Sequence, residues 1–156
     1  MKALSHFVSF TLVILFVITS VSLVLVVVTP ALDKAKDSST ITEAFRNLET
    51  IDTAIKEVAS EGENAKRTIN IKITEGTIKS DPTNDYLNFT YTLKEDTSLS
   101  GQRNNINITK SGKELTLFIA YSNIDINGTA HFTKGDNKII IENQGVSNNK
   151  PVIYIG

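Results

Sequence analysis

Side chains suited to catalysis are few in this chain. Histidine occurs twice, at His6 and His131; the first precedes a long apolar run and the second falls in a predicted strand. The two imidazoles therefore cannot meet in one subunit. The sequence has no cysteine, no Gly-x-Ser-x-Gly nucleophile motif and no phosphate-binding glycine loop. We expect no catalytic residue, no cofactor and no enzymatic activity.

One stretch has the spacing of a metal-binding loop. Residues 123–128, NIDING, resemble the first half of a calcium loop of the D-x-[DN]-x-[DN]-G type, with Asn123 in the place of the first aspartate. The twelfth position of that loop would be Lys134, where calcium requires the bidentate carboxylate of a glutamate. The alternation of Ile124 and Ile126 before Asn-Gly instead predicts a strand that enters a tight hairpin turn. We expect no metal site.

Three asparagines have the Asn-x-Thr spacing of acceptors for N-linked glycans: Asn88, Asn107 and Asn127. Asn88 and Asn107 fall on the polar phase of alternating segments, and Asn127 falls in an Asn-Gly turn. All three side chains are therefore expected to face solvent. A surface rich in Asn and Thr also yields such triplets by chance. Glycosylation at any of them would place this part of the chain outside the membrane.

The element that dominates the chain is one uncharged apolar run from Phe7 to Val28. As a helix this run reaches roughly 33 Å, close to the thickness of a bilayer's hydrocarbon core. A cleavable secretory signal has a shorter apolar stretch of ~7–15 residues, although Thr29–Ala31 offers small residues for a cut. We expect the helix to be retained, to be long enough to span a membrane and to tolerate a kink at Pro30.

The helical pattern continues beyond the apolar run. An apolar stripe recurs at Ile41, Phe45, Leu48, Ile51, Ile55 and Val58. The other face is expected to carry Glu43, Arg46, Glu49, Asp52, Lys56 and Glu57. Thr40 and Glu43 have the spacing of a capping box, so this helix either starts afresh at Thr40 or continues unbroken. Gly62 is expected to end it.

From Arg67 the periodicity changes to the alternation of half-buried strands. Strands are predicted at residues 68–74, 87–93, 106–109, 115–121, 130–133, 138–142 and 152–155. Turns are predicted at residues 75–76, 80–82, 111–112, 127–128, 135–137 and 148–149. Short strands at close spacing favour an antiparallel sheet or small sandwich over parallel β-α-β units. The predicted fold class is α+β, with a β-rich region at residues 67–156.

The helix and the sheet are expected to bury each other. The apolar face of the amphipathic helix would cover one side of the sheet. Pro151–Ile155 is apolar on both phases, which predicts a buried central strand rather than an exposed edge. The exposed side of the helix from Thr40 to Val58 and the edge strands then remain as candidate contact surfaces.

Charge and cysteine content exclude some partners. The 16 basic and 17 acidic side chains nearly balance, and no basic block is present, so we expect no nucleic-acid partner. The absence of cysteine removes disulfides and thiolate metal sites. The β-rich region must therefore be held by packing and backbone pairing.

The arrangement as a whole resembles an archaeal type IV pilin: a very short basic leader, a long apolar helix, an amphipathic extension and a β-rich C-terminal region. Lys2-Ala3-Leu4-Ser5 looks like the processing site of that family. The resemblance implies cleavage after Ala3 by a prepilin peptidase, which leaves Leu4 as the mature N-terminus. His6 stands where many relatives have proline. The glutamate near the mature N-terminus of bacterial pilins is missing, as is usual in archaeal ones.

The resemblance also implies a function. After removal of residues 1–3, the helix at residues 4–61 would leave the membrane and pack with copies of itself in a cell-surface filament, with residues 4–30 in its core. Low alanine and glycine content makes an adhesion pilus a better match than a rotary filament. Implied partners are the peptidase, the assembly machinery and other subunits. The implied core residues are Phe7, Phe10, Leu12, Ile14, Leu15, Phe16, Ile18, Val21, Leu23 and Leu25.

A second interpretation remains open from the sequence. The chain would be a single-pass anchored protein whose extracellular β-rich region is a binding module and which never polymerises. Lys2 would then only help to orient the helix in the membrane.

Overall fold

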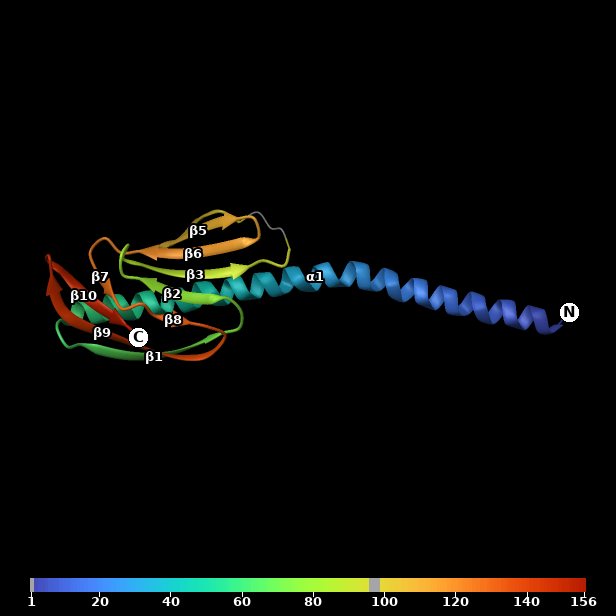
Figure 1. Ribbon diagram of the computed structural model, residues 1–156, viewed down its shortest axis with the longest axis horizontal. Coiled ribbons are helices and arrows are strands. Elements are labelled where there is room, and N and C mark those ends of the chain that lie inside the picture. Colours follow the sequence, from blue (N-terminus) through green and yellow to red (C-terminus); the bar gives the residue numbers. More distant parts are fainter. Residues whose placement is uncertain (1, 96–98) are drawn as a thin grey trace. The chain divides into compact units, whose positions relative to one another are not determined.

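A computed structural model describes residues 2–95 and 99–156, with side chains from Val8 onward. The described chain forms one long helix followed by strands, which confirms the predicted α+β class (Figure 1). The elements are α1 (Lys2–Glu61), β1 (Lys66–Ile73), β2 (Thr77–Asp81), β3 (Tyr86–Thr92), β4 (Gly101–Arg103), β5 (Ile106–Ser111), β6 (Glu114–Ala120), β7 (Asp125–Asn127), β8 (His131–Phe132), β9 (Gly135–Ser147) and β10 (Lys150–Ile155).

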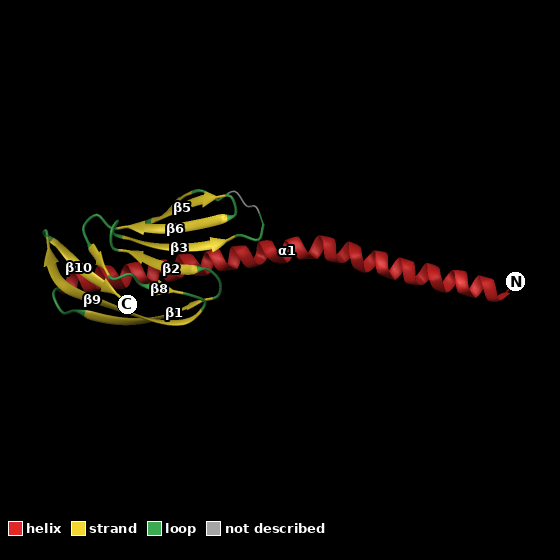
Figure 2. Cartoon of the chain, in the orientation of Figure 1, coloured by secondary structure: helices red, strands yellow, loops and turns green. Residues whose placement is uncertain are grey.

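Helix α1 is continuous through Pro30 and Thr40 (Figure 2). Proline has no N–H, so the carbonyl of Val26 loses its usual partner at Pro30 while the helix continues. Of the two sequence interpretations, the unbroken helix holds, and Thr40 is an interior residue rather than an N-cap. The helix ends before Gly62, whose φ of +96° is the left-handed conformation that closes helices.

The chain divides into two compact units, residues 1–36 and residues 37–156. The first consists of α1 residues. The second, called the head below, contains the rest of α1 and all the strands. Sheet A has the strand order β1-β9-β10-β7, and sheet B has the order β4-β5-β6-β3-β2-β8.

The core of the head lies where α1 meets both sheets. In Figure 1 the teal part of α1 runs among the strands of both sheets. Leu48, Ile51, Ile55 and Val58 of the helix are fully buried in one cluster with residues such as Leu117 of sheet B and Ile139, Ile141 and Ile153 of sheet A. The helix therefore packs against both sheets and leaves one face exposed, rather than covering one side of a single sheet.

The predicted helical stripe is largely confirmed. Phe45, Leu48, Ile51, Ile55 and Val58 are buried, and Ile41 packs at the margin of the core. Asp52, expected on the polar face, is instead buried. Because sheets lie on two sides of the helix, the buried arc is wider than the apolar stripe.

The strand predictions hold for β1, β3, β5, β6, β8, β9 and β10. Strand β2 was not predicted, because one of its inward positions is polar. The buried Ser80 hydroxyl donates to the carbonyl of Gly128 and accepts the N–H of Ala130. Strand β4 was also missed, because all three of its residues are exposed and show no alternation.

Two turn predictions are wrong, and a third is displaced: Ser80 and Asp81 belong to β2, so the turn predicted at residues 80–82 lies at residues 82–85. Residues 135–137 open β9 and form no turn. Asn127-Gly128 is not a hairpin, because β7 pairs in parallel with β10 of sheet A while β8 pairs with β2 of sheet B. The C-terminal prediction is confirmed in part: β10 lies between β9 and β7 with Ile153 and Ile155 buried, but Tyr154 on the other phase is exposed.

Candidate assembly surface

The first unit exposes an almost continuous apolar surface. None of the most apolar window of α1 is buried within the chain. The described residues predicted for a filament core are all exposed, from 43% for Ile14 to 71% for Phe16: Phe10, Leu12, Ile14, Leu15, Phe16, Ile18, Val21, Leu23 and Leu25. The side chains of Ala3, Leu4 and Phe7 lie outside the described residues.

The hydroxyl groups in this segment do not interrupt the apolar surface. Thr19 donates to the carbonyl of Leu15 at 2.7 Å, and Ser20 donates to that of Phe16 at 2.8 Å. Ser22 and Thr29 make the same bond one turn back. Because these four hydroxyls are satisfied inside the helix, they need no polar partner on the outer surface, as hydrocarbon or a helix bundle requires.

By length and composition α1 can cross a membrane, a test that a signal sequence near an N-terminus also passes. The N-terminal apolar helix therefore indicates membrane insertion or a signal sequence.

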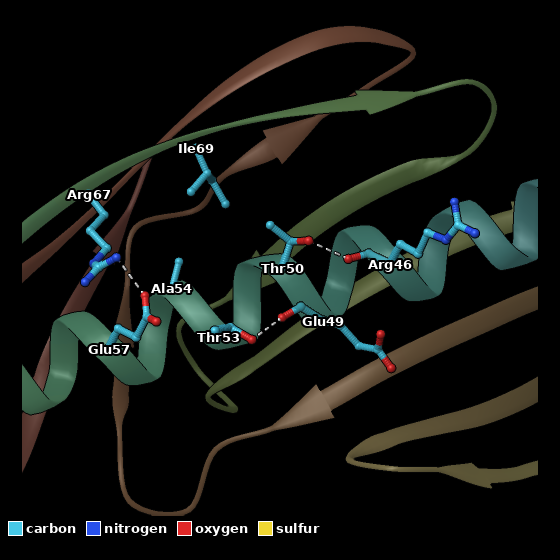
Figure 3. Close-up of a pocket in the computed structure, with 8 residues that line it drawn as sticks. All are labelled: Arg46, Glu49, Thr50, Thr53, Ala54, Glu57, Arg67 and Ile69. Atoms are coloured by element: carbon cyan, nitrogen blue, oxygen red, sulfur yellow. Dashed lines mark hydrogen bonds and ion pairs between the residues drawn. The ribbon is translucent and has the colours of Figure 1, made fainter.

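The face of α1 that the head leaves uncovered forms a shallow groove of ≈ 540 Å³ beside β1 (Figure 3). Arg67 of β1 pairs with Glu57 at 2.8 Å and with Glu61 at 2.6 Å across one end. The hydrogen bond to Glu61 and the charge of Glu57 raise the pKa of Arg67 further above its ordinary value. Thr50 and Thr53 turn their hydroxyls to helix carbonyls, so methyl groups line the middle. The sequence analysis named the exposed side of the helix from Thr40 to Val58 as a candidate contact surface. In the structure, that side of the helix forms this groove.

A buried carboxylate lies where the head begins. Asp37 accepts hydrogen bonds from the Tyr91 hydroxyl at 2.7 Å and from the backbone N–H groups of Lys94 and Glu95, both at 3.1 Å. Burial alone would raise the pKa of Asp37, but these donors outweigh it and lower the pKa. Burial and the Asp37 carboxylate raise the pKa of Tyr91. The arrangement fixes this turn of α1 to the end of β3.

A second buried carboxylate is less fully paired. Asp52 Oδ2 binds Lys56 Nζ at 2.6 Å. Asp52 Oδ1 and the Tyr121 hydroxyl are both buried without a hydrogen-bond partner. Burial, and then the charge of Asp52, raise the pKa of Tyr121. Neither cluster was predicted from the sequence pattern.

The predicted acceptor asparagines lie on outward positions of three strands. Asn127 in β7 is exposed, whereas Asn88 in β3 and Asn107 in β5 are half-buried. Of the calcium-like stretch, Asp125 and Asn127 lie in β7, and the Ile126 N–H is held by Asp85 Oδ1 at 2.9 Å. Residues 2–95 and 99–156 contain no group of three or more His, Cys, Asp or Glu arranged to hold a metal ion. His131 is exposed in β8.

These features define an α+β protein with an apolar N-terminal helix and a β-sheet domain, an architecture consistent with that of pilins. A family model matches residues 2–146, and the chain belongs to that family, the family of unknown function DUF7289. The match covers α1 and nearly all of the head. Neither the curated proteins nor the solved structures contain a match to the chain.

Proposed function

We propose that the chain is a structural subunit of an extracellular filament resembling an archaeal type IV pilus, assembled through α1 and serving adhesion. The observation that carries the proposal is the apolar surface of residues 8–28, whose large side chains are exposed and in which Thr19, Ser20 and Ser22 bond their hydroxyls to carbonyls of the same helix. A helix surrounded by neighbours in a bundle needs such a surface.

The structure of the head supports a separate role for the apolar run. The head's apolar core is built from residues between Ala44 and Ile155 and, among the side chains that the structure describes, includes none from residues 8–28. This part of the apolar run therefore contributes nothing to that core and is free for other partners. Its Val, Ile, Leu and Phe side chains offer stiff, well-defined packing surfaces.

The expected course begins with a membrane-inserted precursor. A prepilin peptidase cleaves after Ala3, and Leu4 becomes the mature N-terminus. Assembly machinery then moves the helix from lipid into the bundle while new helix contacts form, because the free energy of exposing it to water, ~25 cal/mol per Å² of apolar area, is large. The proposal involves no cofactor, no nucleic acid and no catalysis by the chain itself.

The test is negative-stain electron microscopy of material sheared from cells that express the full chain with its own peptidase. Filaments whose subunits begin at Leu4 by mass spectrometry are the expected result. A smooth cell surface, with full-length monomer found only in the membrane, would refute the proposal and leave the anchored binding module.

A pair of variants separates packing from folding. Phe16→Asp places a charge on the exposed apolar surface and should abolish filaments. Phe16→Leu keeps the surface apolar and should leave them intact. Membrane-fraction levels of both variants must be compared, because a central aspartate costs about 2.5–3.5 kcal/mol in membrane insertion. Filaments that form equally well with Phe16→Asp would contradict a core role for this helix.

A further inference from the structure

Aromatic side chains on the outer faces of the head stand opposite the acceptor asparagines. Most aromatic residues of the head are buried, for example Phe45, Phe89, Tyr91 and Tyr121. Outward-facing aromatics occur at three described positions of the strands: Tyr86, Phe118 and Tyr154. Two of these three are register partners of the acceptor asparagines.

Phe118 lies between two acceptors on sheet B. Asn107 of β5 and Asn88 of β3 both pair with Phe118 of β6, one from each side. Leu117 and Ile119 are buried on the other face, so Phe118 projects outward with the asparagines. The Phe118 ring also contacts the Tyr86 ring at a centroid distance of 6.2 Å, which holds it in place.

Tyr154 has the same relation to the third acceptor. Asn127 of β7 pairs with Tyr154 of β10, and Tyr154 is 37% exposed. A Cβ atom added at Gly128 would lie 3.0 Å from the Tyr154 ring. The ring therefore lies against the middle residue of the Asn127-Gly128-Thr129 acceptor sequence.

The three acceptors differ in access. Asn127 and Asn107 lie in or beside the short edge strands β7 and β4, each of three residues, which can open at low cost. Asn88 lies in β3, inside sheet B, and its Oδ1 is buried without a partner. Phe118 is the register partner of both Asn88 and Asn107. A sugar attached to Asn107 that packs on the Phe118 ring would therefore also cover the ring beside Asn88.

We propose that Asn107 and Asn127 carry N-linked glycans whose first sugars pack on Phe118 and Tyr154, and that Asn88 stays unmodified. Each ring buries the apolar C–H face of a sugar, which favours the attached state. The proposal rests on the proposed function only in placing the head outside the membrane.

The covalent step needs a sugar donor linked to a lipid phosphate and a membrane transferase. A bond forms between Asn Nδ2 and the anomeric carbon of the sugar. The bond from that carbon to the phosphate oxygen breaks, the lipid phosphate leaves with the electron pair, and one Nδ2 proton is released. At Asn127 the second Nδ2 hydrogen remains able to donate to Gln144 Oε1, now 2.7 Å away.

Trypsin separates the three acceptors, because cleavage after Lys and Arg yields residues 80–94 with Asn88, residues 104–110 with Asn107 and residues 114–134 with Asn127. Full-length protein from cells that carry their own transferase is digested and its glycopeptides are measured by mass spectrometry. We expect sugar on the second and third peptides and none on the first. Unmodified protein, or sugar on residues 80–94, would overturn the proposal.

The role of the rings is tested by stability. Thr109→Ala removes the acceptor sequence but keeps Asn107, and should lower the Tm of the glycosylated protein by about 3 °C. In a Phe118→Leu background, which keeps an apolar side chain without a ring, that shift should vanish. The same test for Asn127 uses Thr129→Ala, alone and in a Tyr154→Leu background. Equal shifts with and without the ring would refute the packing.

These outcomes are independent of assembly. Glycosylated protein that stays a membrane monomer would refute the filament and support the inference, whereas unmodified filaments would do the reverse. Protein made in a host without the transferase is the control. There Thr109→Ala removes only the Thr109 hydroxyl, which lies 3.5 Å from the Thr116 carbonyl oxygen, and should lower the Tm by less than in the glycosylated protein.

Discussion

Replacement of Asp37 should destabilise the head through three hydrogen bonds at once. The side chain is only 2% exposed and accepts from the Tyr91 hydroxyl and from the N–H groups of Lys94 and Glu95. A hydrogen bond to a charged group contributes about 1.5–3 kcal/mol. Water can reach the partly buried backbone groups, so we expect Asp37→Ala to lower the free energy of unfolding by about 3 kcal/mol. Tyr91→Phe removes one bond and should cost about 1.5 kcal/mol.

The assay is guanidinium unfolding of the full chain in nonionic detergent, followed by circular dichroism of the β signal. Asp33→Asn is the matched control, because it lies in the same charged stretch but outside the head, and should change the free energy by less than about 0.5 kcal/mol. The double variant Asp37→Ala with Tyr91→Phe should cost less than the sum of the two single variants, since both remove one shared bond. Strict additivity would refute the direct contact.

The same carboxylate predicts a dependence on pH. The pKa of Asp37 is lowered in the folded head, so its contribution is fully present above the ordinary aspartate value of about 3.9 and is lost as pH falls through the lowered pKa. Asp37→Asn should remove this part of the acid destabilisation. An acid limb that is identical in the wild type and in Asp37→Asn would show that Asp37 is not the group responsible.

Three further perturbations test other parts of the head by the same unfolding measurement. Leu48→Ala empties a fully buried site and should cost about 2–5 kcal/mol, whereas the exposed Thr50→Ala should change little; equal effects would place Leu48 outside the core. Tyr121→Phe removes a buried hydroxyl without a partner and should be neutral or stabilising, and a loss above about 1 kcal/mol would reveal a bond to Asp52. Gly76→Ala should destabilise the β1–β2 turn, because φ is +90° and the new Cβ would lie 2.5 Å from the Phe89 ring; wild-type stability would contradict that packing.

What the sequence predicts well is local. An uninterrupted apolar run and a helical stripe specify α1, and clean alternation specifies strands such as β3 and β6, because each residue's environment repeats at a fixed interval. The prediction fails where a single position breaks the pattern for a non-local reason. Ser80 is a polar residue at a buried position, and its bonds to Gly128 and Ala130 come from a distant loop.

The buried carboxylates show the same limit. Asp37 ends a stretch of alternating charges that is typical of a solvated surface, and its partner Tyr91 lies 54 residues away along the chain. Asp52 has a lysine one helical turn away, which is typical of an exposed pair. Both carboxylates are buried only in the folded head, where β3 lies against Asp37 and Tyr121 lies near Asp52. The acceptor asparagines were found from their motif, but their aromatic partners depend on strand register, which the sequence does not reveal.

The exposed apolar residues of α1 limit where the chain can exist if the helix is retained. Seventeen large apolar side chains between Val8 and Leu32 are exposed. At about 1.5–3 kcal/mol for full burial of each, their half-exposed surface costs on the order of 20 kcal/mol in water. That exceeds the whole stability of an ordinary domain, about 5–15 kcal/mol. Lipid and a bundle of identical helices both remove this cost. The choice between them therefore depends on the smaller differences of side-chain packing. A charge at Phe16 is costly in both surroundings, so a loss of filaments with Phe16→Asp counts for the bundle only when the variant reaches the membrane at the level of Phe16→Leu.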